Sequence, residues 1–352
     1  MSTIPGLDYY EPLARTLVAF FDELETDLPP LSKKGRWALA MLQNYSLRPS
    51  KRIRGSIAAM MYDHATKQQG DPRGLALGAS IELIQNYLLI VDDVMDRSTM
   101  RRGQPTAHIA YERDFPYSRG REAEMIGMLV GMIAHHASNM LLVKSGGSPE
   151  HIRATMAVLE RTTLLTGIGQ IDDLDQQIGR DVSTEAMLRK YAQKSSYYTF
   201  AAPIEAALTL ANGADAAYRR DAENYGIPAG IAFQLRDDYL GIYGETAKTG
   251  KPNLDDVHEG KYTLMVHLAL EAADAATKKK ILAIVGDASA GEPELEVLRT
   301  VLREVGATDE ALQRGKTYAD QAKTAAKRAT SWGKKEAAIL EDIITFAMER
   351  EN

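Results

Sequence analysis

Three aspartates, Asp92, Asp93 and Asp96, are spaced as a cation site would need. Asp92 and Asp96 are four residues apart, so on a helix they share one face and lie one turn from each other. Two carboxylates in this position repel each other unless a cation lies between them. Because no His or Cys is close, all ligands would be oxygens, and the expected cation is Mg²⁺. Such a cluster can also be a solvated helix end, but the mainly apolar run over residues 81–91 favours carboxylates that face a cavity.

Basic residues lie on both sides of this cluster. Arg101 and Arg102 begin five residues after Asp96, and paired guanidinium groups beside a carboxylate–metal site suit bidentate binding of phosphate oxygens. Lys51 and Arg54 are three residues apart, again on one helical face. Taken alone, Lys51 and Arg54 would be interpreted as solvated surface.

A second acidic cluster, Asp237 and Asp238, follows another apolar helical run over residues 227–233. Lys251 and Lys261 come after it. Both halves of the chain therefore share one order: an apolar helix, paired aspartates, and then a loop that carries basic residues.

The two acidic clusters are far apart in the sequence, so only tertiary packing can bring them together. This predicts one domain over residues 1–352, a single helical bundle around a central cavity lined by metal ligands. The length of 352 residues would by itself suggest two domains.

Helical spacing of apolar residues dominates the chain, and the alternation typical of strands is scarce. The pattern predicts an all-α fold, with helices that include residues 10–24, 56–66, 81–91, 152–165 and 337–348.

Composition narrows the possible classes of protein. Hydrophobic residues make up 45% and charged residues 26% of the chain, which is typical of a soluble globular protein and excludes disorder. The net charge of −6 gives no electrostatic basis for nucleic-acid binding. The absence of cysteine excludes disulfides and thiolate chemistry and fits a reducing cytoplasm. Residues 1–8 lack the pattern of a signal peptide, so we expect a cytoplasmic protein.

Residues 125–143 are long and apolar enough to require a membrane check. They contain His135, His136, Ser138 and Asn139, whereas a spanning segment should be more uniformly apolar. We therefore expect a helix that is buried inside the protein or at a contact between subunits, and no integral membrane segment.

The order of these motifs resembles that of the trans-isoprenyl diphosphate synthases, the polyprenyl synthetase family that includes farnesyl and geranylgeranyl diphosphate synthases. Asp92-Asp93-x-x-Asp96 followed by Arg101-Arg102-Gly103 resembles the first motif of the family, and Phe233-Gln234-x-x-Asp237-Asp238 resembles the second. Gly169-Gln170-Ile171-Asp172-Asp173 is similar to its GQxxD helix, and Lys194-Ser195 to its Lys-Thr pair.

The resemblance implies a short-chain prenyltransferase. Such enzymes ionise an allylic diphosphate (dimethylallyl, geranyl or farnesyl), and the double bond of isopentenyl diphosphate attacks the cation. Asp92 and Asp96 would hold two Mg²⁺ ions and Asp237 a third, with Mn²⁺ as a possible substitute. Asp93, Asp238 and Asp173 would support these ligands from behind.

Two diphosphate sites are implied in the same way. The allylic diphosphate would be bound by a set of cationic and polar residues, namely Arg101, Lys194, Ser195, Gln234, Lys251 and Lys261. Isopentenyl diphosphate would be bound without metal by Lys51, Arg54, Gln85 and Arg102. The dipoles of Gln234 and Ser195 would stabilise the developing cation. No general base stands out, which fits proton removal by the departing diphosphate, as proposed for the family.

Product length is expected to depend on Tyr87 and Leu88, which match the floor of the hydrocarbon tunnel in the family. Helical geometry places Leu88 one turn below Asp92, with Gln85 further down the same face, and Tyr87 more to the side. Tyr87 could instead be a core tyrosine. One aromatic residue at this level suggests geranylgeranyl diphosphate (C20), with farnesyl diphosphate (C15) close behind.

Gly241 departs from the family pattern, because many members have an aspartate there. Since Asp237 and Asp238 remain, we expect weaker support for the metal and not its loss. Gly55 replaces the usual proline after Arg54, Ser50 a glycine before Lys51, and Ser195 a threonine. None of these changes removes a charge or hydroxyl that the chemistry needs.

Two other functions stay open from sequence: a non-catalytic subunit of a heteromeric synthase, and a class I terpene cyclase of related helical fold. The retention of both aspartate clusters argues against the first, and the paired diphosphate sites against the second. We expect a homodimer with residues 125–143 at its contact. Residues 278–352 carry no reactive cluster and are expected to pack around the cavity.

Overall fold

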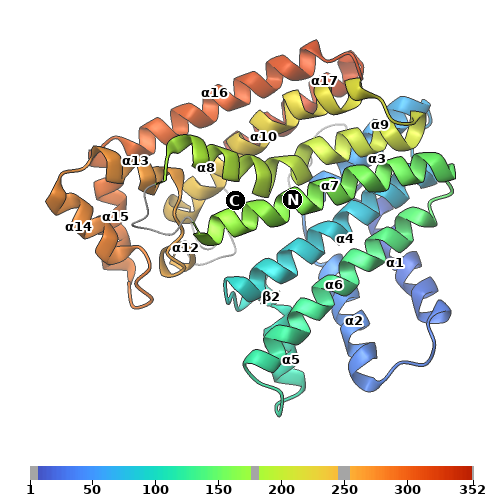
Figure 1. Cartoon of the computed structure of the whole chain (residues 1–352), viewed down its shortest axis with the longest axis horizontal. Coiled ribbons are helices and arrows are strands. Elements are labelled where there is room, and N and C mark those ends of the chain that lie inside the picture. Colours follow the sequence, from blue (N-terminus) through green and yellow to red (C-terminus); the bar gives the residue numbers. More distant parts are fainter. Residues whose placement is uncertain (1–6, 176–181, 245–253, 351–352) are drawn as a thin grey trace. The chain divides into compact units, whose positions relative to one another are not determined.

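The computed structural model describes residues 7–175, 182–244 and 254–350, and these are almost entirely helical (Figure 1). The predicted all-α fold class is confirmed. The described residues group into two compact units. The first contains residues up to Glu160 together with Pro203–Tyr218 and Ser331–Glu336, and the second contains Arg161–Ala202, Arg219–Thr330 and residues from Ala337 onward. The single domain and its central cavity stay predictions, and each unit is described by itself.

The first unit is built from α1 to α6 and from parts of α7 and α9. Its core is formed by apolar side chains such as Leu13, Leu42, Leu83 and Val130. The elements are α1 (Tyr10–Asp27), α2 (Lys33–Leu47), α3 (Ile53–Thr66), α4 (Pro72–Met95), β1 (Met100–Arg101), β2 (Gln104–Pro105), α5 (Ala107–Asp114), α6 (Arg121–Val143), α7 (Pro149–Asp175) and α9 (Ala202–Asn212).

Helix α4 carries the first acidic cluster, and its ends are defined by the sequence. The side chain of Asp71 caps the start by accepting a hydrogen bond from the Arg73 amide at 2.9 Å, and Pro72 takes the first helical position. At the other end, the amide of Asp96 donates to the carbonyl of Asp92 at 2.8 Å, so the helical spacing of these two residues is kept.

An antiparallel hairpin follows where the sequence predicted only a loop. Met100 pairs with Pro105 and Arg101 with Gln104. The two turn residues, Arg102 and Gly103, have positive φ angles of 54° and 72°, as in a type I′ turn, and glycine adopts such angles without strain.

The second unit contains the remaining helices. Leu235, Leu264, Ile281 and Leu298 belong to its core, so the helices after residue 278 do pack onto the helix that carries the second acidic cluster. The elements are α8 (Thr184–Tyr191), η1 (Ala192–Ala201), α10 (Ala216–Tyr243), α12 (Asp255–His258), α13 (Leu264–Ala272), α14 (Ala275–Ile284), α15 (Glu292–Glu304), α16 (Ala307–Arg328) and α17 (Lys334–Glu349).

Segment η1 is a π-helix of ten residues between α8 and α9, and it carries Lys194 and Ser195. Such segments are rare and are frequently found at functional sites. Glycines on both neighbouring helices allow its backbone to approach closely. A Cβ on Gly169 of α7 would lie 2.5 Å from the backbone nitrogen of Lys194. A Cβ on Gly230 of α10 would lie 2.3 Å from the Cα of Ser196.

Two described helices are long and apolar enough to cross a membrane by length and composition. In the most apolar window of α4, 72% of the residues are buried inside the protein, as in an ordinary core helix. In the corresponding window of α6, 44% are buried. Because core helices of soluble proteins meet the same criteria, these two helices are weak evidence for a membrane span.

Candidate active site

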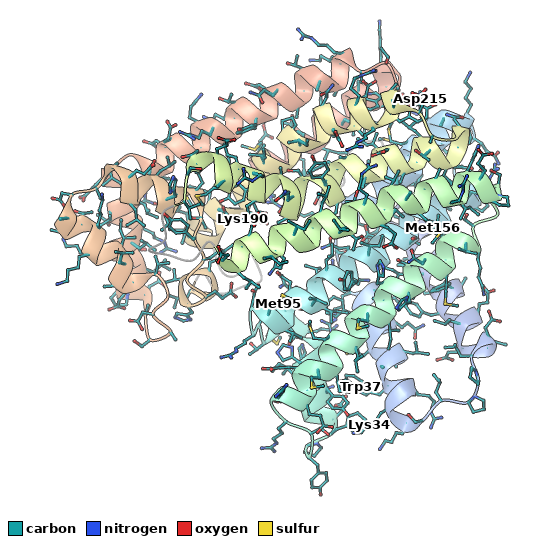
Figure 2. The ribbon with its side chains drawn as sticks, viewed as in Figure 1. Lys34, Trp37, Met95, Met156, Lys190 and Asp215 are labelled. Carbon is teal, nitrogen blue, oxygen red and sulfur yellow. The ribbon has the colours of Figure 1, made fainter. Side chains whose placement is uncertain are left out.

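The first acidic cluster lies at the C-terminal end of α4, close to Met95 (Figure 2). The Asp92 side chain is 25% exposed, and Asp96 is half-buried, so both carboxylates are accessible to a ligand. Asp93, which a helix turns to a different face, is not exposed at all. The two aspartates predicted to hold metal are therefore the accessible ones.

Asp93 is held by two partners. Tyr45 donates its hydroxyl proton to Asp93 Oδ2 at 2.7 Å, and Arg101 Nε donates to Asp93 Oδ1 at 2.6 Å. Burial and the charge of Asp93 raise the pKa of Tyr45, so its proton stays in place. Burial alone would lower the pKa of Arg101, but the charge of Asp93 outweighs it and raises that pKa. Asp93 therefore fixes the position of the Arg101 guanidinium beside Asp92. Nη2 of Arg101 is 3.9 Å from Oδ2 of Asp92.

The predicted isopentenyl diphosphate residues also lie in the first unit. Burial lowers the pKa of Arg102, the charge of Glu82 opposes this effect, and the positive charge of Arg54 adds to it. Gln85 is buried, and its side-chain oxygen accepts no hydrogen bond from the described residues. Lys51 is half-buried and lies just before α3, the helix that carries Arg54.

The glycine after Arg54 has a physical reason. The amide of Gly55 donates a hydrogen bond to Glu82 Oε1 at 2.9 Å, and a proline at this position would have no hydrogen to donate.

Tyr87 and Leu88 have different surroundings. The Tyr87 ring lies 5.2 Å from the ring of His135 on α6, and it packs against the core of the first unit. Leu88 is half-buried and is not part of that core. The alternative interpretation of Tyr87 as a core residue thus agrees with its contacts, and the assignment of Leu88 to the tunnel floor stays a prediction.

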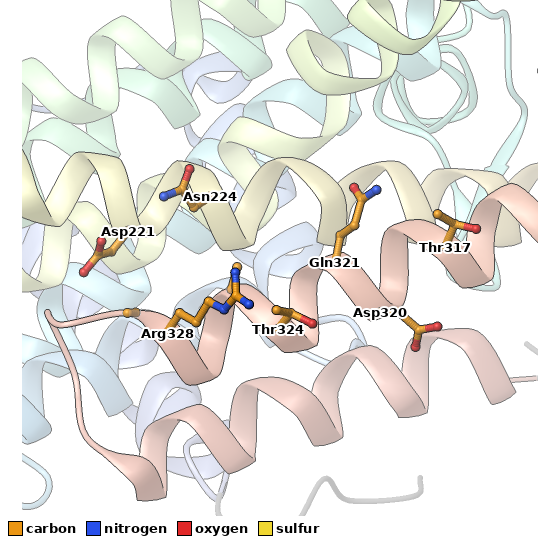
Figure 3. Close-up of a pocket in the computed structure, with 9 residues that line it drawn as sticks. Asp221, Asn224, Thr317, Asp320, Gln321, Thr324 and Arg328 are labelled. Carbon is orange, nitrogen blue, oxygen red and sulfur yellow. The ribbon is translucent and has the colours of Figure 1, made fainter.

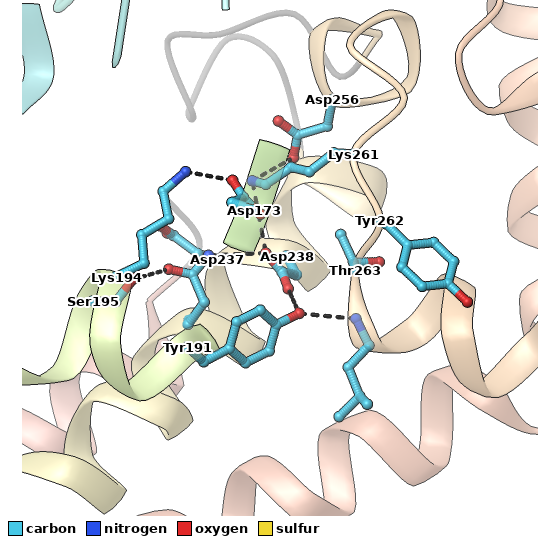
Figure 4. A network of polar contacts seen from close by, with 12 residues as sticks. Asp173, Tyr191, Lys194, Ser195, Asp237, Asp238, Asp256, Lys261, Tyr262 and Thr263 are labelled. Atoms are coloured by element: carbon cyan, nitrogen blue, oxygen red, sulfur yellow. Dashed lines mark hydrogen bonds and ion pairs between the residues drawn. The ribbon is translucent and has the colours of Figure 1, made fainter. Parts of the chain in front are cut away.

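In the second unit, Asp238 is the centre of a buried hydrogen-bond network (Figure 4). Tyr191 donates its hydroxyl proton to Asp238 Oδ2, and Gln234 Nε2 donates to Asp238 Oδ1 at 2.9 Å. The oxygen of Gln234 then accepts from the Ser195 hydroxyl at 2.7 Å. Burial raises the pKa of Asp238, although Lys261, Tyr191 and Gln234 all favour its charged form. The network fixes the orientation of the Gln234 amide.

Asp173 brings two lysines together. Lys194 Nζ is 2.6 Å from Asp173 Oδ2, and Lys190 Nζ is 2.9 Å from Asp173 Oδ1. Lys190, labelled in Figure 2, is buried and also donates to the carbonyl of Tyr262. Burial opposes the charged form of Asp173, but the charges of Lys194 and Lys190 outweigh it and lower the pKa of this carboxyl. Both basic side chains are therefore held beside the second acidic cluster.

Lys261 lies among the acidic side chains of the second unit. Its Nζ is 3.4 Å from Asp256 Oδ2 and 3.7 Å from Asp238 Oδ1. Burial works against its charge, but Asp256 and Asp238 hold the pKa of Lys261 well above its usual value. Lys251, predicted to bind the allylic diphosphate, lies outside the described residues.

Asp237 is the exposed member of the second pair, with 48% of its side chain accessible. Its partner is Arg350, whose Nη2 donates to Asp237 Oδ1 at 2.5 Å. The Arg350 guanidinium also lies 3.9 Å from the centroid of the Phe233 ring. The side chain of Arg236 donates a hydrogen bond to the backbone carbonyl of Arg350. A cation from the C-terminal segment thus occupies the carboxylate predicted to bind metal.

A separate groove lies between α10 and α16 (Figure 3). It is lined by polar side chains that include Asp221, Asn224, Gln321 and Arg328. None of its lining residues belongs to the predicted site, and Asp221 is already bonded to the amide of Thr330 at 2.8 Å.

Sequence reasoning did not find several residues that hold the site: Tyr45, Lys190, Tyr191, Asp256 and Arg350. Lys190 and Tyr191 were within reach, because Lys190 precedes Lys194 by one helical turn and Tyr191 follows it directly. Tyr45 and Arg350 are far from the aspartates in the sequence and belong to no acidic or basic cluster.

The donors present suit Mg²⁺. Among the described residues, no three acidic or histidine side chains form a cluster that would hold a metal alone. This agrees with the habit of Mg²⁺, which binds through one or two carboxylates together with phosphate oxygens of a substrate. The accessible carboxylates of Asp92, Asp96 and Asp237 fit that arrangement.

The comparison with known proteins decides the family. The family model described as polyprenyl synthetase matches residues 36–302. This chain belongs to the polyprenyl synthetase family. The geranylfarnesyl diphosphate synthase of Aeropyrum pernix is 30% identical over 306 residues, which cover 85% of this chain and 90% of that protein. The geranylgeranyl diphosphate synthase of Sulfolobus acidocaldarius is 30% identical and covers 70% of each chain.

Solved structures of polyprenyl synthetases agree. A geranylgeranyl pyrophosphate synthase from Corynebacterium glutamicum, complexed with isoprenyl diphosphate and magnesium, is 29% identical with a TM-score of 0.89, covering 98% of this chain and 99% of that chain. A polyprenyl synthase from Caulobacter crescentus, complexed with calcium and isoprenyl diphosphate, is 26% identical with a TM-score of 0.78, covering 100% of both chains. The prediction of an all-α prenyltransferase is confirmed, and the relatives named here give no support to a cyclase or a non-catalytic subunit.

Proposed function

We propose that this polyprenyl synthetase condenses isopentenyl diphosphate head-to-tail with an allylic diphosphate and releases a short-chain product. The observation that carries the proposal is the environment of the two acidic motifs. Each has an accessible first aspartate and a buried second aspartate, and each lies beside cationic side chains in the order typical of the family.

Asp92 and Asp96 would hold two Mg²⁺ ions and Asp237 a third, with Mn²⁺ as a substitute. Bound Mg²⁺ would neutralise the charge of the allylic diphosphate and make it a better leaving group. Arg101, Lys194 and Lys261 would bind that diphosphate through their positive charge, and the aspartate beside each of them would hold its side chain in position. Lys251 is proposed to join them on the resemblance alone. Gln234 and Ser195 orient their dipoles toward the cation that develops.

Isopentenyl diphosphate would bind to the cationic residues of the first unit. Arg102, Arg54 and Lys51 would supply positive charge, and the amide nitrogen of Gln85 would donate a hydrogen bond to a phosphate oxygen. No carboxylate of the aspartate motifs is needed there, which suits a diphosphate that has to stay attached.

Product length follows from the residues below Asp92. Leu88 is proposed as the floor of the tunnel, and a floor at this depth favours a C20 product, with C15 as the nearest alternative.

The test is mass spectrometry of products from isopentenyl diphosphate with dimethylallyl, geranyl or farnesyl diphosphate in the presence of Mg²⁺. We expect geranylgeranyl diphosphate as the main product and no product when the metal is chelated. If isopentenyl diphosphate is not consumed and the allylic substrate alone gives a hydrocarbon, the chain is a cyclase. If product forms only after another chain is added, it is a partner subunit.

We also infer that two copies associate through α6. Its apolar side chains at helical spacing are exposed, with accessible fractions from 38% to 57%, and they are Met125, Leu129, Met132, Met140 and Val143. An apolar stripe of this length is expected to be covered by a partner. Light scattering should give a dimer for the wild type and a monomer for Leu129→Lys/Met132→Lys, and a monomeric wild type at micromolar concentration would contradict this proposal.

A cytoplasmic location is compatible with the cysteine-free sequence.

A further inference from the structure

The missing aspartate at position 241 has a steric explanation. A Cβ placed on Gly241 would lie 2.1 Å from Asp256 Oδ2 and 3.1 Å from Asp256 Cγ. A side chain at position 241 would therefore force the Asp256 carboxylate out of its place. Glycine at 241 leaves this space to a carboxylate that arrives from another element, the short helix α12.

Asp256 is held in this place by a backbone hydrogen bond and by an ion pair of its side chain. The Lys261 amide donates to the Asp256 carbonyl at 3.0 Å, which closes the turn that joins α12 to Lys261. The Asp256 side chain is only 15% exposed, and its Oδ2 is 3.4 Å from Lys261 Nζ. The same Lys261 Nζ is 3.7 Å from Asp238 Oδ1, so Asp256 and Asp238 both form ion pairs with one ammonium group.

The charge interactions point the same way. Burial disfavours the charged form of Lys261, and Asp256 is the strongest of the acidic groups that oppose this effect, ahead of Asp238 and Asp237. The position of Asp256 beside Lys261 therefore favours the charged ammonium group.

We propose that Asp256 supplies, from α12, the carboxylate that the second acidic motif lacks at position 241, and that it positions Lys261 beside Asp238. Asp256 is a positioning residue for the cation proposed at Asp237 and for Lys261. This inference rests on the proposed function. It replaces the expectation, stated from the sequence, that Gly241 weakens the support of the metal.

The structure provides a reciprocal test. Gly241→Ala places a methyl group against Asp256 and should lower the thermal unfolding temperature. Asp256→Ala removes the obstacle, because Asp256 Cβ lies 3.8 Å from the Cβ that a residue at 241 would have, an ordinary contact distance. In the Asp256→Ala background, Gly241→Ala should therefore lower the unfolding temperature much less. This part of the test needs no catalytic activity.

The second part moves the carboxylate. Mg²⁺ binding in the presence of inorganic diphosphate is measured by calorimetry for the wild type, Asp256→Ala, Gly241→Asp/Asp256→Ala, and the control Gly241→Asn/Asp256→Ala. Groups that support metal ligands typically contribute about 10- to 100-fold in affinity. We expect Asp256→Ala to weaken binding by about tenfold or more, Gly241→Asp/Asp256→Ala to recover most of this loss, and the asparagine control to recover none.

Two results would overturn the inference. Wild-type Mg²⁺ affinity in Asp256→Ala would show that its carboxylate supports nothing. Equal affinity of the aspartate and asparagine double variants would show that position 241 cannot take over from Asp256. If the wild type makes no prenyl diphosphate, the proposed function fails, whereas the steric and metal-binding comparisons still give their own answer.

Discussion

Neighbouring aspartates in each motif have different environments. Asp92 and Asp237 are accessible, whereas Asp93 and Asp238 are buried with exposed fractions of 0% and 1%. Consecutive helical residues point in different directions, so one member of each pair faces the ligand side and the other faces the protein. Each buried aspartate accepts a hydrogen bond from a tyrosine hydroxyl group. Each also lies beside a basic side chain, Arg101 for Asp93 and Lys261 for Asp238.

Removing one of these hydroxyl groups is expected to destabilise the protein. Tyr191→Phe leaves the buried Asp238 with one donor fewer and takes the acceptor from the Leu264 amide, which is 2.8 Å from the tyrosine oxygen. We expect a loss of about 1.5–3 kcal/mol in the free energy of unfolding by urea, as for hydrogen bonds to charged groups. The control is Tyr225→Phe, whose hydroxyl donates to a neutral carbonyl at 3.0 Å and should cost about 0.5–1.5 kcal/mol. Equal losses in both variants would contradict the role given to Asp238.

Product length is a prediction about a single residue. Leu88→Ala removes the side chain one turn below Asp92 and should lengthen the product beyond C20. Tyr87→Ala, by contrast, removes a ring that packs against His135 and the core, so it should chiefly lower stability. Mass spectrometry of products from farnesyl and isopentenyl diphosphate distinguishes the two. A longer product from Tyr87→Ala and an unchanged one from Leu88→Ala would reverse the assignment.

The extent to which single residues could be predicted depends on sequence distance. The four-residue spacing of Asp92 and Asp96 is enough to place them together on a helix. Asp256 and Gly241 are not neighbours in the sequence, and Arg350 and Asp237 are more than a hundred residues apart, so no local pattern reveals either contact. Glycine at 241 was visible, but its reason was not.

At the scale of elements, the C-terminal end of α17 is fastened to α10. Arg350 is bonded to Asp237, its ring contact is Phe233, and its carbonyl accepts from Arg236 at 2.6 Å. Arg350 therefore occupies the accessible carboxylate that is proposed to bind a metal.

Weakening this contact should favour metal binding. An ion pair with a carboxylate as exposed as Asp237 is worth about 1 kcal/mol or less, so Arg350→Gln should raise Mg²⁺ affinity by up to roughly fivefold. Calorimetry with Mg²⁺ and inorganic diphosphate measures the effect, with Arg328→Gln, from the groove between α10 and α16, as the control. Weaker Mg²⁺ binding by Arg350→Gln would show that Arg350 supports the site and does not compete for it.

A pH dependence is expected where α8 meets α13. His267 of α13 is buried, with its ring nitrogens 3.1 Å from Thr184 Oγ1 and 3.2 Å from the Tyr262 hydroxyl. Burial lowers the pKa of His267, and Glu271 offsets this only in part. The unfolded chain therefore binds the proton more readily, and the free energy of unfolding should fall as the pH drops below about 6.5.

The variant that tests this is His267→Gln, which should lose less stability than the wild type between about pH 7 and pH 5.5. Thermal unfolding across this range measures the difference. An identical pH dependence for the wild type and His267→Gln would exclude this contribution.

Elements differed in how well the sequence predicted them. Apolar spacing identifies α1, α3, α4 and α17, because a core-facing helix needs that period. The π-helical segment η1 does not follow the α-helical period, so a pattern of apolar residues at three- and four-residue spacing does not predict it. The hairpin after Asp96 has a local signal in Arg102-Gly103, but two residues per strand are too few for an alternation.

At the scale of the whole molecule, the fold class and family follow from composition, periodicity and motif order together. The family model covers residues 36–302, and the Corynebacterium structure covers 98% of the chain. The site is predicted less completely, because the residues that support it come from distant segments. The proposal that both acidic motifs act on one allylic diphosphate belongs to this scale.

Incorporation of labelled isopentenyl diphosphate tests that claim most directly. Wild type, Asp92→Asn and Asp237→Asn are compared with farnesyl diphosphate and Mg²⁺, with circular dichroism as the check on folding. The account predicts labelled geranylgeranyl diphosphate from the wild type and a loss of orders of magnitude in rate for each variant, although both stay folded. A wild-type rate in either variant would contradict it.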